Sequence, residues 1–216
     1  MNDTATDKKS SDSGPSIGSC WSCHGPVDPV ALFCHVCGAV QPPGPVDHFQ
    51  RLGLVARFDL DPAEIGRRYI AFQQRLHPDR FAGKSARERT IAERHAVSLN
   101  EAYETLKDPL RRGSYLLQRA GRASPTAENR TIDDPALLME TMERREALSE
   151  ASSIDRVAAL AKAAATDEEM LLDALKAAFA ADNLNAATGL LTRLRYLRKF
   201  AEEARARRAV LAETGT

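Results

Sequence analysis

A proline-fixed corner, Leu76-His77-Pro78-Asp79-Arg80, constrains the fold of this chain more than any other stretch. Pro78 disfavours α-helical geometry at His77 and fixes one backbone dihedral of the turn. A helix that begins at Asp61-Pro62, with an N-cap and a proline at its first position, must therefore end at this corner. Apolar residues in that helix are spaced four, three and four apart, which predicts one buried stripe made of Ile65, Tyr69, Phe72 and Leu76.

A second helix leads away from the corner and is predicted over residues 86–106, where Asp108-Pro109 ends it. Its inner side carries Ile91, Leu99, Ala102, Tyr103 and Leu106. Two long helices joined by a turn form an antiparallel hairpin, which needs a further element to cover its apolar side. A short helix over residues 48–55 and the segment 111–119 are predicted to supply that cover.

The corner carries an imidazole and a carboxylate, and we interpret it as a docking site and not as a catalytic pair. Asp79 can accept a two-pronged hydrogen bond from an arginine of another protein, whereas no nucleophile lies nearby in the sequence. Basic residues of the preceding helix fall off its apolar stripe: Arg67, Arg68 and Arg75. A solvated face is the usual explanation of such charges, but beside a docking corner they would form a basic strip for an acidic partner. A His-Pro-Asp triplet alone is also compatible with an ordinary helix turn, so the residues that flank it decide between a turn and a docking site.

All four cysteines lie in two Cys-x-x-Cys pairs about ten residues apart: Cys20, Cys23, Cys34 and Cys37. This spacing is typical of two facing knuckles around one tetrahedral metal ion. Zinc is the predicted occupant, with iron in a rubredoxin-like site as the alternative. Disulfides are the main rival, but a cytosolic thiol pool would keep them reduced. Four thiolates complete the coordination shell, so no position remains for a hydrolytic water.

The residues around these cysteines leave two roles open for the metal knuckle, a structural role and a second contact surface. His24 and His35 are interpreted as bystanders, because four sulfurs already satisfy zinc. Gly25 and Gly38 follow the two pairs, where a positive φ is often needed. Trp21 and Phe33 are expected to cover the metal or to pack on the neighbouring domain. The absence of Lys and Arg between Cys20 and Cys37 argues against phosphate binding.

Composition divides the rest of the chain. Residues 1–18 are rich in Ser, Asp and Thr and are predicted to be a disordered tail. They lack an apolar signal-peptide core and contain Asp but no Arg, which favours the bacterial cytoplasm over the mitochondrion.

The zinc knuckle spans 19–41, a proline-rich linker follows, and the helical-hairpin domain spans 46–121. The net charge is zero, so no global field attracts nucleic acid, and no apolar run is long enough for a membrane span.

Three further helices are predicted in the C-terminal part. The first begins at Asp133-Asp134-Pro135, the second covers residues 153–181, and the third covers 184–211 after a break at Asp182-Asn183. The last helix has an apolar stripe of Leu190, Leu194, Leu197 and Ala201. Short turns between them predict an antiparallel three-helix bundle over 131–213. The fold class is therefore mainly α, with a zinc knuckle, a helical hairpin and a bundle.

Residues 137–148 indicate a binding surface on the first bundle helix. Leu138 and Met142 share one face, and Met139, Glu143 and Glu146 occupy an adjoining face. An apolar and acidic seam of this kind fits a small partner protein, and methionine suits an adaptable contact. The alternative for Leu138 and Met142 is plain core packing.

The last helix is basic and offers a different function, a nucleic-acid footprint. It carries Arg193, Arg195, Arg198, Lys199, Arg205, Arg207 and Arg208. Few aromatic residues are interleaved with these charges and the whole chain is neutral. Both facts favour a solvated or protein-facing surface.

Three stretches together resemble a J-domain and are most similar to the HscB family of iron–sulfur cluster co-chaperones. They are Asp47-His-Phe-x-x-Leu-Gly-Leu, the corner from Leu76 to Phe81, and Leu99-Asn-Glu-Ala-Tyr103-x-x-Leu106-Lys-Asp-Pro109-Leu-x-Arg. The resemblance continues to the end of the chain, and the cysteine pairs resemble a metal-binding extension found in some members. Residues 46–121 would then be the J-domain.

The resemblance implies an adaptor and not an enzyme. His77, Pro78 and Asp79, with Arg67, Arg68 and Arg75, would dock a DnaK/HscA-type chaperone and stimulate its ATPase. The bundle would hold an IscU-like iron–sulfur scaffold through Leu138, Met139, Met142, Glu143, Glu146, Arg195 and Tyr196. The protein would thereby assist iron–sulfur cluster assembly and transfer.

Other functions stay open at this point. A general J-domain co-chaperone for unfolded clients would show no preference for a scaffold; the specific seam and the lack of a Gly/Phe-rich linker argue against it. A zinc-ribbon nucleic-acid-binding protein would use the basic last helix. A metalloenzyme is the least favoured, because a four-sulfur site has no open position and no phosphate-binding loop is present.

Overall fold

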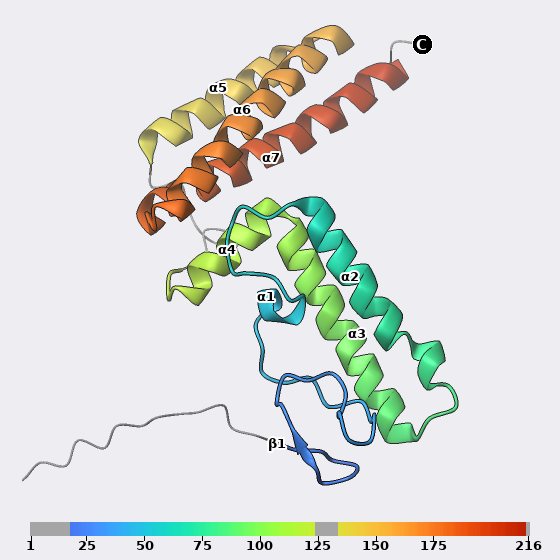
Figure 1. The fold of residues 1–216 in the computed structure, drawn as a ribbon. Helices are drawn as coiled ribbons and strands as arrows, with labels where there is room; N and C mark the ends of the chain where they lie inside the picture. Colours follow the sequence, from blue (N-terminus) through green and yellow to red (C-terminus); the bar gives the residue numbers. More distant parts are fainter. Residues whose placement is uncertain (1–17, 124–133, 215–216) are drawn as a thin grey trace, which may run out of the picture. The chain divides into compact units, whose positions relative to one another are not determined.

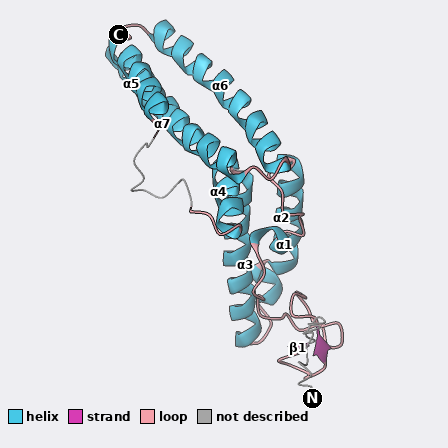
Figure 2. Ribbon diagram, turned by 90° about the vertical axis from the view of Figure 1, so that its left-hand side faces the viewer, coloured by secondary structure: helices cyan, strands magenta, loops and turns pink. Residues whose placement is uncertain are grey.

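The computed structural model describes residues 18–123 and 134–214 (Figures 1 and 2). It is mainly helical, as predicted, and it also contains one small sheet that was not predicted. Residues 1–17, most of the predicted disordered tail, lie outside the described residues, as does most of the loop expected between the hairpin and the bundle. Gly18, assigned to the tail, instead pairs with Val27 in the sheet. The elements are β1 Gly18–Ser19, β2 Pro26–Val27, α1 His48–Arg51, α2 Pro62–Leu76, η1 Pro78–Phe81, α3 Ala86–Lys107, α4 Pro109–Arg119, α5 Pro135–Glu150, α6 Ile154–Ala180 and α7 Leu184–Thr214.

Helix boundaries agree closely with those predicted where a proline or a cap sets them. The Asp134 side chain accepts hydrogen bonds from the N–H groups of Ala136 and Leu137, which starts α5. Asp108 caps α4 in the same way, so that helix starts at Pro109, two residues before the predicted segment. The predicted helix over 48–55 was too long: α1 ends at Arg51, and Gly53 has a φ of +63°, which a helix cannot contain.

The described residues form two compact units, and the division passes through α2 and α3. The first unit contains the residues up to Asp47 together with Ala71–Asn100. Its core combines the cysteine segment with the facing halves of α2 and α3: buried Val40, Leu76, Phe81, Ile91 and Ala92, with Trp21, Leu32 and Phe33 packed against them. Leu76 and Ile91 are therefore core residues, as the helical stripes predicted.

The second unit contains His48–Ile70 and the residues from Glu101 onwards. Tyr69 of α2 stacks on Tyr103 of α3, with ring centroids 4.2 Å apart. α4 packs on α7, and α6 and α7 lie side by side (Figure 1). One core joins Phe58, Leu117, Leu175, Ala178, Ala187, Leu191 and Leu194. Phe58 and Leu117 come from the predicted J-domain and the others from the predicted bundle, so both segments contribute to this core.

Arg193 and Arg198 of α7 form ion pairs with residues of other elements. Arg198 donates to Asp108 at 2.5 Å and to Glu168 at 2.8 Å, which ties α7 to the start of α4 and to α6. Burial would lower the pKa of Arg198, but Asp108 and Glu168 more than offset it and raise that pKa. Arg193 pairs with Glu140 of α5. In the described parts of the chain, no helix is both long and apolar enough to cross a bilayer.

Candidate metal centre and docking surfaces

The two Cys-x-x-Cys pairs form turns with matching backbone hydrogen bonds. In the first turn the His24 N–H donates to the Cys20 carbonyl at 2.9 Å, and in the second the Gly38 N–H donates to the Cys34 carbonyl at 2.9 Å. The N–H groups of Ser22 and Val36 point at the sulfurs of Cys20 and Cys34, each at 3.4 Å. This pairing of equivalent turns brings all four sulfurs within 4.8 Å of one another.

The sulfur spacing fits one tetrahedral metal ion. The Sγ atoms of Cys20 and Cys37 lie 3.7 Å apart, and those of Cys23 and Cys34 lie 3.8 Å apart. Metal–sulfur bonds of about 2.3 Å in a tetrahedron place sulfurs about 3.8 Å apart. A disulfide needs about 2.05 Å, and all four cysteines are free. The predicted metal ligands therefore converge on one site that could hold a metal ion.

The residues that border the cysteines differ in one respect from the prediction. Gly38 has the expected positive φ of +75°, but in the first turn His24, at +60°, takes that conformation and Gly25 does not. The reason is register: His24, like Gly38, directly follows the second cysteine of its pair. The side chains of His24 and His35 are exposed, and the ligand cluster consists of the four cysteines.

The pKa values of the Cys20 and Cys23 thiols differ because the four sulfurs lie close together. Burial would raise the pKa of Cys20, but the backbone at Cys23 and Ser22 and the neighbouring thiols lower it to about 6. The backbone at Gly25 would lower the pKa of Cys23, but the Cys37 thiol, burial and the other two thiols raise it to about 12. One sulfur ionises readily while its neighbour resists a second negative charge. A bound cation would relieve that repulsion.

The predicted docking corner has the expected geometry. α2 ends at Leu76, His77 is extended with a ψ of 132°, and Pro78–Phe81 forms one turn of 3₁₀ helix, η1. The His77 Nδ1 atom accepts a hydrogen bond from the Asp79 N–H at 3.3 Å and lies 3.4 Å from the Asp79 Oδ2 atom. The Asp79 side chain is 90% exposed. Its carboxylate is therefore available to another molecule.

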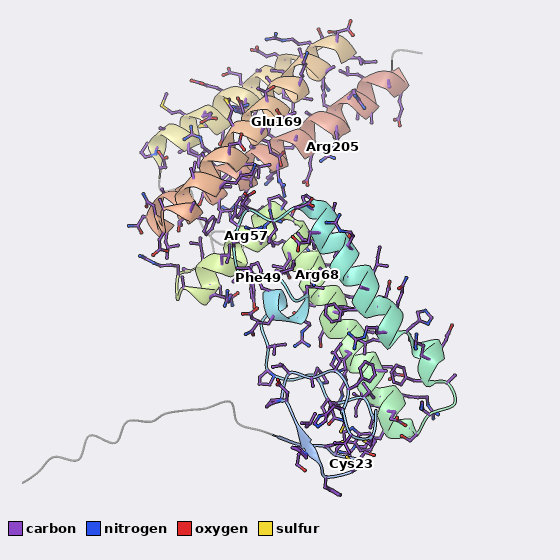
Figure 3. All side chains as sticks on the ribbon, viewed as in Figure 1. Cys23, Phe49, Arg57, Arg68, Glu169 and Arg205 are labelled. Atoms are coloured by element: carbon purple, nitrogen blue, oxygen red, sulfur yellow. The ribbon has the colours of Figure 1, made fainter. Side chains whose placement is uncertain are left out.

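The three predicted arginines of α2 are exposed, but they have different neighbours. Arg75 belongs to the same unit as the corner, and its guanidinium lies 5.4 Å above the ring centroid of Phe33. Arg67 and Arg68 belong to the other unit, where they lie 3.5 Å from Asp61 and 3.6 Å from Glu64. Figure 3 labels Arg68 on α2 and Cys23 on the cysteine segment.

The predicted seam on α5 is exposed. Leu138, Met139 and Met142 are 45%, 64% and 62% exposed, so core packing does not explain Leu138 and Met142. Glu143 and Glu146 are also exposed, whereas Leu137 and Leu148 bury the opposite side of the helix. The five predicted residues of α5 therefore all face solvent.

The two predicted residues of α7 contact each other. The Arg195 guanidinium donates to the Tyr196 hydroxyl at 3.1 Å. Tyr196 also lines a cavity of about 240 Å³ between α5, α6 and α7. From α5 this cavity receives Leu137, Glu140, Thr141 and Arg144, which lie within the predicted stretch 137–148 but are not among its predicted contact residues. Their spacing marks one helical face and could have identified them.

Comparison with known proteins gives consistent results. Residues 133–205 match a family model described as the HSCB C-terminal oligomerisation domain. The chain is 33% identical over 197 residues to the human iron-sulfur cluster co-chaperone protein HscB, covering 89% of this chain and 83% of that protein. It is 39% identical over 157 residues to a co-chaperone protein HscB homolog of Cupriavidus taiwanensis, covering 71% and 89%.

Solved structures agree with these relatives. The crystal structure of human co-chaperone protein HscB superposes with a TM-score of 0.79 at 32% identity, covering 88% of this chain and 98% of that chain. The chaperone HscB from Vibrio cholerae gives 0.67 at 32% identity, covering 77% and 99%. The resemblance seen in the sequence is thereby confirmed, and the chain belongs to the HscB family of iron–sulfur cluster co-chaperones.

Proposed function

We propose that this protein brings an IscU-like iron–sulfur scaffold to a DnaK/HscA-type chaperone and stimulates the ATPase of that chaperone. The observation that carries the proposal is the exposed His77-Pro78-Asp79 corner in a member of this co-chaperone family. The Asp79 carboxylate can accept two parallel hydrogen bonds from an arginine of the chaperone. Arg67, Arg68 and Arg75 would add contacts to an acidic chaperone surface.

The scaffold surface is proposed on α5 and α7. Leu138, Met139 and Met142 expose large apolar side chains on consecutive turns of one helix, and such exposed groups commonly mark an interaction site. Glu143 and Glu146 would pair with basic groups of the scaffold, and Arg195 and Tyr196 would extend the contact from α7. Docking one protein at each surface raises the effective concentration of scaffold at the chaperone. ATP hydrolysis itself then takes place in the chaperone.

The metal that we propose is zinc, which a closed four-thiolate shell suits well. Purified protein is expected to contain about one zinc ion per chain, measured by inductively coupled plasma mass spectrometry. Cys37→Ser removes one ligand and should lose most of the metal, whereas His35→Ala, two residues away with an exposed side chain, should retain it. A folded preparation without metal would contradict the assignment, and iron in place of zinc would correct it.

The experiment that tests the whole proposal is the steady-state ATPase of the chaperone, with this protein and with or without the scaffold. We expect this protein alone to stimulate the chaperone ATPase, and we expect the scaffold to raise the ATPase rate further and synergistically. Tighter binding to the ATP-hydrolysing conformation of the chaperone increases the population of that conformation. Stimulation indifferent to the scaffold would instead indicate a general co-chaperone for unfolded clients. The absence of any stimulation would refute the interpretation of His77-Pro78-Asp79 as a chaperone-docking site.

A further inference from the structure

Each buried metal-site cysteine has an aromatic neighbour that holds an arginine of the helical hairpin. Cys20 and Cys34 are buried, whereas Cys23 and Cys37 are exposed. Trp21, which follows Cys20, has the Arg87 guanidinium 4.4 Å above its ring centroid. Phe33, which precedes Cys34, has Arg75 above its ring. Cation–π contacts of this kind fix the direction of an otherwise flexible side chain, and Arg75 is one of the proposed docking residues.

The cysteine segment also packs against both ends of the corner. Buried Val40 shares a core with Leu76 and Phe81, the residues on either side of His77-Pro78-Asp79-Arg80. The Trp21 indole N–H donates to the Val40 carbonyl at 2.7 Å, and Val40 pairs with Phe33 in an antiparallel bridge. Val40, which packs against both ends of the corner, thus lies three residues after Cys37, and its partners Trp21 and Phe33 are adjacent to Cys20 and Cys34 in the sequence.

A third connection runs through Gln41, which is buried. Its side-chain N–H group lies 3.3 Å from the Cys20 sulfur and donates to the Ala39 carbonyl at 2.8 Å. Its backbone carbonyl lies 2.7 Å from the ring nitrogen of His95 in α3. A single residue therefore joins a metal ligand to the second helix of the hairpin.

We propose that the metal knuckle, residues 19–41, positions the chaperone-docking corner, so that metal occupancy sets how well the corner binds the chaperone. Apart from one pair of two-residue strands and the Phe33–Val40 bridge, this segment has little regular structure, so four metal–sulfur bonds would add strongly to its order. Loss of metal would release Phe33 from Arg75, and Val40 from Leu76 and Phe81. The corner would then spend less time in its docking conformation, which lowers apparent affinity in proportion. Exposed Cys23 and Cys37 give a chelator access to the ion.

The first test needs no chaperone and uses the full-length, metal-loaded protein. Amide hydrogen exchange of residues 76–82 is compared before chelation, after chelation and after zinc is restored. The bonds from the Arg80 N–H to the His77 carbonyl and from the Ala82 N–H to the Asp79 carbonyl report on the corner directly. We expect exchange there to become about tenfold faster without metal and to recover with zinc. Unchanged exchange in metal-free protein would overturn the coupling.

The second test rests on the proposed function and uses Phe33→Leu, which keeps an apolar side chain but removes the ring beneath Arg75. We expect zinc content to be retained and the concentration needed for half-maximal ATPase stimulation to rise about fivefold, with the maximum unchanged. Phe33→Tyr restores the ring and should restore wild-type behaviour. Val36→Ala, on the exposed side of the knuckle, is the matched control and should change nothing.

The outcomes separate the two ideas. Wild-type stimulation together with an unaffected Phe33→Leu variant would overturn the positioning role and leave the proposed function intact. A wild-type protein that fails to stimulate would refute the proposed function, while the exchange experiment would still decide the coupling. If chelation unfolds the whole chain, the metal-loaded Phe33→Leu variant decides it through exchange at residues 76–82.

Discussion

Asp79→Ala is expected to abolish stimulation of the chaperone ATPase while leaving the fold intact. The Asp79 side chain is 90% exposed, and the contact described for it is with the neighbouring His77. Surface substitutions of this kind change stability by about 0.5 kcal/mol or less. Loss of a charge-assisted, two-pronged contact at the centre of an interface costs far more. Steady-state ATPase measurements and thermal melts followed by circular dichroism test the two halves of this expectation.

The matched control for Asp79→Ala is Lys84→Ala, another exposed charged residue just beyond the corner. The Lys84 backbone carbonyl accepts from Arg89, a bond that alanine retains, and its side chain is outside the proposed contact. Full stimulation by Asp79→Ala would reduce the corner to a helix turn. A large drop in melting temperature for that variant would show that Asp79 has a structural role instead.

Local rules predicted most helix ends, apart from the end of α1 and the start of α4, because the interactions that set them are short in sequence. Pro62, Pro78, Pro109 and Pro135 each stand at the first position of a helical segment in the structure. The cysteine pairs were equally local: two intervening residues fix each turn, and the 4.8 Å cluster followed. The assignment of a positive φ to Gly25 was wrong because it followed the residue type, glycine, and not the position directly after the second cysteine of the pair, which His24 occupies.

Contacts between segments that are far apart in the chain could not be predicted from the sequence. Arg198 reads as one of several solvent-facing arginines, yet it pairs with Asp108, ninety positions earlier. Arg112 is buried, donates to the Leu106 carbonyl at 2.7 Å and stacks on Phe58, although a charged residue in a helix is ordinarily exposed. The same limit applies to Tyr196, whose cavity partners on α5 could be grouped by spacing but not assigned to it.

These long-range pairs also bear on the nucleic-acid alternative. Arg193 and Arg198 are bound to carboxylates of other helices, and Arg205 and Arg207 donate to the backbone carbonyls of Ala201 and Ala151. Phosphate binding would have to replace these contacts. Arg193, Arg198 and Arg207 therefore link α7 to other segments of the second unit.

The double variant Leu138→Ala/Met142→Ala is expected to weaken scaffold binding at least tenfold, about 1.4 kcal/mol. Truncation of large apolar contact residues near the centre of an interface usually has effects of this size. Both side chains face solvent in the free protein, so its stability should barely change. Isothermal titration calorimetry with the scaffold measures the affinity, and chaperone stimulation without scaffold should stay at the wild-type level.

Two further variants show whether the apolar or the acidic residues of α5 carry the contact. Ile154→Ala is the matched control for Leu138, since Ile154 is 43% exposed on α6 outside the predicted surface, and it should bind the scaffold normally. Lysines in place of Glu143 and Glu146 should also weaken binding, with an effect that shrinks as salt screens the charges. The loss of scaffold affinity caused by the apolar truncations should persist at high salt. If neither set changes scaffold affinity, the scaffold contacts another face, and the cavity beside Tyr196 becomes the next surface to test.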